Sequence, residues 1–133
     1  MVMQRPNWCH ETSLPAEPAS ARRARVFVIH YLVEHRLMYL IDPIRLITSE
    51  LTTNAIQHAR TAFTVTLKGF DGVVVVTVED RVSVKPDPSV PQQVLATSGR
   101  GLGIVEVLSD EWGVIDDRPG SKTVWASFAT RSQ

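Results

Sequence analysis

The segment that decides the fold spans residues 50–59 and reads ELTTNAIQHA. It continues a helical pattern that begins at Asp42 and Pro43, a pair that predicts a helix start with Asp as the cap and Pro in the first turn. The apolar stripe of this predicted helix consists of Ile44, Ile47, Leu51 and Ala55. Glu50 and Asn54 lie four residues apart, so both project from the same face of the helix, about one turn from each other. The sequence therefore holds a carboxylate and an amide side by side on a helix that ends near residue 59.

Two interpretations of this pair are open from the residues alone. In the first, Asn54 offers its carbonyl oxygen to Mg²⁺, which prefers hard oxygen ligands, while Glu50 orients or deprotonates a nucleophile. In the second, both residues belong to a solvated polar face. His58 is the remaining titratable group on the helix, and it either reaches a phosphate or a partner or donates a structural hydrogen bond to backbone.

The elements on either side of this helix predict the fold class. An amphipathic helix is expected over residues 19–36. Strands are expected at residues 8–14, 64–70, 73–80, 112–115 and 123–128. Asp71 and Gly72 suit a two-residue type I′ hairpin turn, and the run from Val73 to Val76, which is apolar on both faces, indicates a strand inside the sheet. This order predicts an α+β fold, a two-layer sandwich with a mixed, mostly antiparallel sheet covered by helices on one face.

Asp80 ends the second strand of the predicted hairpin. It projects a carboxylate, which only accepts hydrogen bonds, from the edge of a buried sheet. Such a group can receive the exocyclic amine of adenine and reject guanine, which carries an oxygen at that position. The alternative is an aspartate that forms a turn at the end of a strand.

Three glycines, Gly99, Gly101 and Gly103, lead into a short predicted helix. Glycine lets backbone approach a ligand closely, and a helix N-terminus presents unpaired N–H groups, so this segment predicts a phosphate site. A Walker loop is absent, and a dinucleotide fingerprint lacks its strand immediately before the glycines. The other interpretation is a hinge without a ligand, because the preceding residues up to Ser98 are rich in proline and typical of a lid.

Length and composition limit the function classes. The 133 residues suit one domain at 19–130 preceded by an N-terminal arm at 1–18. The 14 basic and 14 acidic residues balance, so bulk charge favours neither nucleic acid nor an anionic membrane as a direct partner. The single cysteine, Cys9, excludes an internal disulfide, and no apolar run approaches the roughly 20 residues of a bilayer span. We expect a cytoplasmic protein.

Residues 50–59 resemble the N box of the GHKL superfamily, which includes gyrase, heat-shock chaperone ATPases, histidine kinases and mismatch-repair ATPases. Asp80 stands where the first glycine box begins, and Gly99–Gly103 resemble the second. Within the superfamily, the sequence is most similar to the small bacterial anti-sigma factor kinases and to actinobacterial ATP-binding regulators. The resemblance covers residues 19–128, and its most specific part is Gly101–Val105 followed by Trp112-Gly113-Val114.

The resemblance implies a Bergerat-type fold that binds ATP and Mg²⁺. Asn54 would be the magnesium ligand, Asp80 would contact adenine and Glu50 would act as catalytic base. The full set of nucleotide-binding residues implied in this way is Asn54, His58, Asp80, Gly99, Arg100, Gly101, Leu102, Gly103 and Thr123. Thr123, near the start of the last strand, would form a hydrogen bond near Asp80, often through water.

The function implied by the resemblance is a serine/threonine kinase that transfers the γ-phosphate of ATP to a serine of an anti-sigma antagonist protein, or a protein that sequesters a sigma factor, usually as a homodimer. The alternative is a binding module of the same fold that grips its partner without phosphoryl transfer. One residue departs from the pattern, because Val82 stands where the family usually has glycine. A β-branched side chain resists positive φ, which predicts a differently shaped pocket floor.

Overall fold

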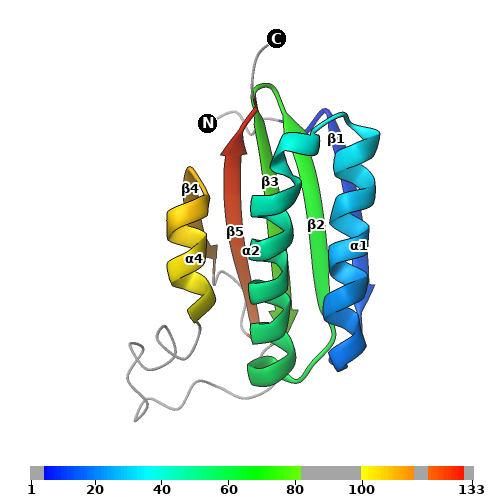
Figure 1. Cartoon of the computed structure of the whole chain (residues 1–133). Helices are drawn as coiled ribbons and strands as arrows, with labels where there is room; N and C mark the ends of the chain where they lie inside the picture. The colour runs from blue at the N-terminus through cyan, green and yellow to red at the C-terminus, as the bar shows by residue number, and fades with distance from the viewer. Residues whose placement is uncertain (1–4, 82–99, 116–119, 131–133) are drawn as a thin grey trace.

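The computed structural model describes residues 5–81, 100–115 and 120–130. They form two layers, a five-stranded sheet and a set of helices that cover one of its faces (Figure 1). The strands are β1 (Trp8–Leu14), β2 (Phe63–Phe70), β3 (Val73–Arg81), β4 (Glu111–Ile115) and β5 (Ser121–Ala129). The helices are α1 (Pro18–Glu34), α2 (Ile41–Asn54) and α4 (Arg100–Leu108), with a 3₁₀ turn η1 (Met38–Leu40) and a π-helical turn η2 (Ala55–Ala59). None of these helices combines the length and apolar character that a bilayer span requires.

The sheet has the strand order β1-β2-β3-β5-β4. The α+β sandwich predicted from the sequence is confirmed, and β3 lies at the centre, as the apolar run at its start indicated. The sheet is not mixed, however, because each of the four pairings between the described strands is antiparallel. At the centre of the sheet, Val76 lies between Leu67 of β2 and Ala126 of β5.

The core lies between the sheet and the helices. Val74, Val76 and Val78 of β3 are almost fully buried, whereas the residues between them are half-buried. Successive side chains of a strand point to opposite faces, so the buried set faces the helices. Helix α2 packs on β3 with Ile44 and Ile47 fully buried, and burial of each such side chain stabilises the fold by about 1.5–3 kcal/mol.

Two local predictions were wrong. Asp42 does not cap α2, because the helix begins at Ile41, directly after η1, and Asp42 instead lies in the first turn and pairs with Arg45 at 3.4 Å. The turn between β2 and β3 is not type I′, which needs positive φ at both central residues. Only Gly72 has it, with φ of 75°, while Asp71 keeps negative φ.

The edge strand β1 is attached to the end of α1 by a group of aromatic rings. Trp8 stacks on His35 with ring centroids 3.8 Å apart, and His10 stacks on Tyr31 at 3.7 Å. The Nε2 atoms of His10 and His35 share a hydrogen bond of 2.9 Å. Burial, and after it the neighbouring His10, lowers the pKa of His35, while Glu34 raises it. The predicted strand at residues 8–14 is therefore an integral part of the sheet.

Trp8 also lies directly on Gly69, its partner across the strand pair. A Cβ at position 69 would lie 2.1 Å from the Trp8 ring, so Gly69→Ala must displace the indole from its stack on His35. We expect a loss of about 1–3 kcal/mol in the free energy of unfolding, measured by guanidinium chloride titration with circular dichroism.

The matched control for this variant is Gly103→Ala in α4, where an added Cβ meets nothing within 4 Å. This change should leave stability equal or raise it by about 0.5–1 kcal/mol, because alanine favours helix over glycine. Wild-type stability in Gly69→Ala would contradict the packing of Trp8 on the sheet.

Candidate functional site

Three segments that are distant in sequence meet at one end of the sandwich (Figure 1). They are the end of α2 with η2, the end of β3 and the beginning of α4, and β5 starts at the same end. Turn η2 packs against β3, and α2 packs against α4. Every segment that carries a predicted site residue therefore has a described part at this end.

Glu50 and Asn54 are both half-buried on α2, one helical turn apart, as predicted. Asn54 is the last residue of α2, and the backbone then widens into the π-helical turn Ala55–Ala59. The turn ends at Arg60, whose left-handed φ of 55° reverses the chain toward β2. Single π turns inside helices are frequent at functional sites. His58 lies in this turn, and its side chain is outside the described part of the structure.

Asp80 continues the buried run of β3 and is 9% exposed. It lies between Phe63 of β2 and Lys122 of β5. Its Oδ1 is buried and has no hydrogen-bond partner among the described residues. Leaving such an acceptor unpaired costs about 1–3 kcal/mol, so a ligand that donates a hydrogen bond to it gains this free energy. Burial raises the pKa of the Asp80 carboxyl, Lys122 lowers it and Glu79 raises it.

The structure corrects the expected position of Thr123. Thr123 lies opposite Glu79, and its hydroxyl donates to the Glu79 carboxylate at 3.3 Å. Both residues are on the face of the sheet that points away from the helices. Asp80, the next residue along β3, points to the opposite face, toward the helices. The residue opposite Asp80 is Lys122, which the sequence analysis did not identify. Counting back in steps of two from the buried Val124 would have found it.

The glycine segment begins α4, as predicted. Arg100, Gly101 and Leu102 form the first turn of the helix, and only their backbone is described, while Gly99 lies outside the described residues. Gly103 is exposed within the helix. Val105 is fully buried and holds α4 against α2. The N–H groups of the first helical turn, which have no partner within the helix, are therefore presented at the end of the sandwich where Asp80 lies.

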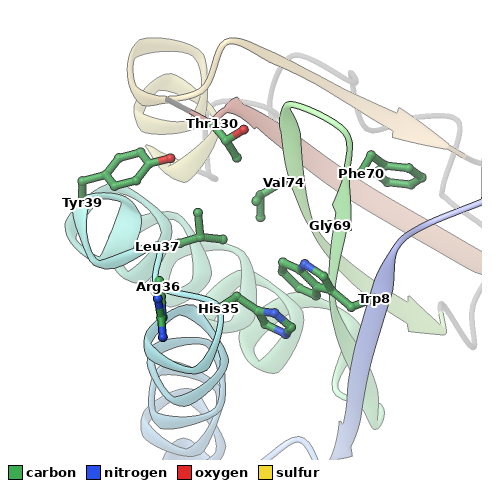
Figure 2. Close-up of a pocket in the computed structure, with 9 residues that line it drawn as sticks. All are labelled: Trp8, His35, Arg36, Leu37, Tyr39, Gly69, Phe70, Val74 and Thr130. Carbon is green, nitrogen blue, oxygen red and sulfur yellow. The ribbon is translucent and has the colours of Figure 1, made fainter. Parts of the chain in front are cut away.

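A separate cleft of about 370 Å³ lies at the other end of the sheet (Figure 2). Its walls include Trp8, His35, Tyr39, Phe70 and Thr130. These residues come from β1, from the turn after α1 and from the ends of β2 and β5 that are remote from Asp80. Among the described residues, none of the predicted site residues lines this cleft. The predicted nucleotide residues and this cleft are therefore different regions of the molecule.

Comparison with known proteins gives a family and a fold. Residues 14–128 match the family described as the histidine kinase-like ATPase domain. Among solved structures, the chain resembles the RsbU and RsbW domains of Rv1364c from Mycobacterium tuberculosis, with a TM-score of 0.68 and 22% identity. That match covers 93% of this chain and 33% of the other, so the chain spans one third of that structure's length. A search of curated proteins finds no match.

The family match includes α2, β3, α4 and β5 as far as residue 128. The N-terminus of α4 lies at the same end of the sheet as the end of β3. The GHKL resemblance deduced from the sequence motifs is thereby confirmed at the level of the family. This chain belongs to the histidine kinase-like ATPase domain family.

Proposed function

We propose that this chain is a cytoplasmic regulator of the anti-sigma factor kinase type, which binds Mg²⁺-ATP and transfers the γ-phosphate to a serine of an anti-sigma antagonist protein. The main observation that supports a nucleotide site is the buried Asp80 carboxylate, whose Oδ1 lacks a hydrogen-bond partner among the described residues. An adenine amine is a donor that fits this acceptor. Asp80 is the second-last residue of β3, and this strand ends at the same end of the sandwich as α2 and the N-terminus of α4, which supports one shared ligand.

Each part of the nucleotide has a group of suitable chemistry at this end. Asp80 accepts from the adenine amine, and the backbone amides at the start of α4 bind phosphate oxygens. Asn54 supplies one hard oxygen ligand, which suits Mg²⁺ because this ion is usually held by one or two protein groups together with substrate phosphates. When bound, the ion neutralises charge on the phosphate oxygens. Glu50 accepts the proton of the incoming serine hydroxyl.

The partner assignment rests on the sequence resemblance to anti-sigma factor kinases, and on a likeness in fold to a protein that contains an RsbW domain. We propose an anti-sigma antagonist protein or a sigma factor as partner and a homodimer as the working form. The rival function is a module that grips such a partner without transferring phosphate. Val82, which replaces the glycine usual in the family, favours the rival, while a carboxylate one turn from Asn54 favours the kinase.

The Asp80→Asn variant tests adenine recognition. The amide can turn a donor toward the adenine amine, and even with its oxygen facing the amine it lacks the negative charge that strengthens the hydrogen bond. We expect ATP binding to weaken by about 1–3 kcal/mol in calorimetric titration. Glu79→Gln is the matched control, because Glu79 is adjacent on β3 but on the opposite face, and its ATP affinity should stay near that of wild type. Equal losses in both variants would contradict the assignment.

The Asn54→Ala variant tests the metal ligand. Loss of the amide oxygen should remove the dependence of ATP affinity on Mg²⁺, while the circular dichroism spectrum stays native because Asn54 is only half-buried. The measurement is an ATP titration with and without Mg²⁺. The neighbouring variant Thr53→Ala should keep the full Mg²⁺ effect. An Asn54→Ala protein that still binds ATP more tightly with Mg²⁺ would exclude Asn54 as ligand.

The Glu50→Gln variant separates the kinase from the binding module. Glutamine keeps the size of the side chain but cannot accept a proton, so ATP affinity should be near normal while transfer falls by about 10²- to 10⁴-fold. The assay is single-turnover transfer from labelled ATP to the antagonist proteins of the same genome, with an ATP titration on the same variant. Unchanged transfer would exclude Glu50 as base. A wild-type chain that binds ATP and an antagonist yet transfers nothing would establish the binding module.

A further inference from the structure

Lys122 shares a face of the sheet with Asp80. The two residues are direct partners across the β3–β5 pairing, and cross-strand partners point to the same side. On β5 the buried, helix-facing residues are Val124, Ala126 and Phe128, and Lys122 continues this series by one more step of two. Lys122 is exposed, whereas Asp80 is buried. Lys122 therefore lies at the rim of the site, on the same face of the sheet as the Asp80 carboxylate.

The other described neighbours of Asp80 do not supply a positive charge to this face. Phe63, its partner on β2, is apolar and 1% exposed. The part of α2 that packs on β3 contributes apolar side chains to the core. Turn η2 also packs on β3, and the side chain of its one titratable residue, His58, lies outside the described part of the structure. Glu79 and Arg81 flank Asp80 on its own strand and point to the opposite face. Among the described residues, Lys122 is thus the cation placed to favour the charged form of Asp80.

The charge of Lys122 acts on Asp80 without a direct ion pair. Within the described part of the chain, Arg45 and Asp42 form the one ion pair shorter than 4 Å. Lys122 consequently lies beyond direct contact with Asp80 and leaves Oδ1 unpaired. Burial raises the pKa of Asp80 and the charge of Lys122 opposes that rise. The ionised carboxylate matters for recognition because its hydrogen bond to an amine is charge-assisted and about twice as strong as a neutral one.

We propose that Lys122 is a positioning residue of the nucleotide site, which keeps Asp80 ionised and thereby sets the pH range over which the chain recognises an adenine amine. This inference rests on the proposed nucleotide function. The direction of the expected pH effect follows from the negative charge of Asp80 and the positive charge of Lys122. ATP affinity falls as the pH drops through the pKa of Asp80, and removal of the Lys122 charge raises that pKa, so the fall begins at a higher pH.

The test compares Lys122→Met with Lys122→Arg. Both side chains resemble lysine in length at an exposed position, but only arginine keeps the charge. The pKa of Asp80 is measured by carbon NMR of the carboxyl group in the protein without nucleotide, and ATP affinity is measured by calorimetry between pH 5 and 8. We expect Lys122→Met to raise the Asp80 pKa and to weaken ATP binding about two- to fivefold on the acidic side, the usual size of an effect from an exposed charge. Lys122→Arg should match wild type in both measurements.

A second comparison distinguishes an effect through Asp80 from a direct contact with the nucleotide. In the Asp80→Asn background, Lys122→Met should cause no further loss of ATP affinity, because no titratable group remains for Lys122 to act on. An equal loss in that background, or an Asp80 pKa that does not respond to Lys122→Met, would overturn the inference. A responsive pKa in a wild-type protein that binds no ATP at any pH would support the charge coupling and overturn the proposed function, so the two failures are distinguishable.

Discussion

Helix α2 lies on the central strand β3 with its apolar stripe buried, and this contact decides where the polar residues that follow each element lie. Ile44, Ile47 and Leu51 pack into the core that Val76 and its neighbours provide. Both elements run toward the same end of the sandwich, and Asn54 and Asp80 lie at that end because they stand at the C-terminal ends of α2 and β3. A shift of α2 by one turn along β3, about 5.4 Å, would separate the amide from the carboxylate. Core packing therefore positions the candidate site.

The candidate site opposes the stability of the fold mainly at Asp80, where a carboxylate is buried. The strand alternation that buries Val74, Val76 and Val78 also brings the carboxylate to the inner face, where burial disfavours its charge. Apolar side chains at this position would suit the core better, so the carboxylate breaks the local pattern at the place where a ligand is proposed. Proteins commonly accept such local conflicts at functional sites. Lys122 partly offsets this effect of burial, although its ammonium is exposed and forms no ion pair with Asp80 within 4 Å in the described part of the chain.

Sequence patterns predicted the elements and the family because these depend on periodicity and on short motifs. They were less successful where a shift of one residue along a strand moves a side chain to the other face of the sheet. Thr123 and Lys122 are neighbours in sequence but lie on opposite faces of β5, so the position opposite Asp80, which the resemblance led us to expect for Thr123, is occupied by Lys122. The Asp42 cap and the type I′ turn failed because α2 begins at Ile41, one residue before Asp42 and directly after η1, and because Asp71 keeps negative φ. The roles assigned to Glu50 and to the glycine segment stay predictions.

The central claim is that the end of the sandwich around Asp80 recognises adenine. Calorimetric titration of the wild-type protein with Mg²⁺-ATP and with Mg²⁺-GTP tests it most directly. The account predicts binding of ATP and clearly weaker binding of GTP, because the Asp80 carboxylate accepts from the adenine amine but would face the carbonyl oxygen of guanine. Equal affinity for the two nucleotides, or binding of neither, would contradict it.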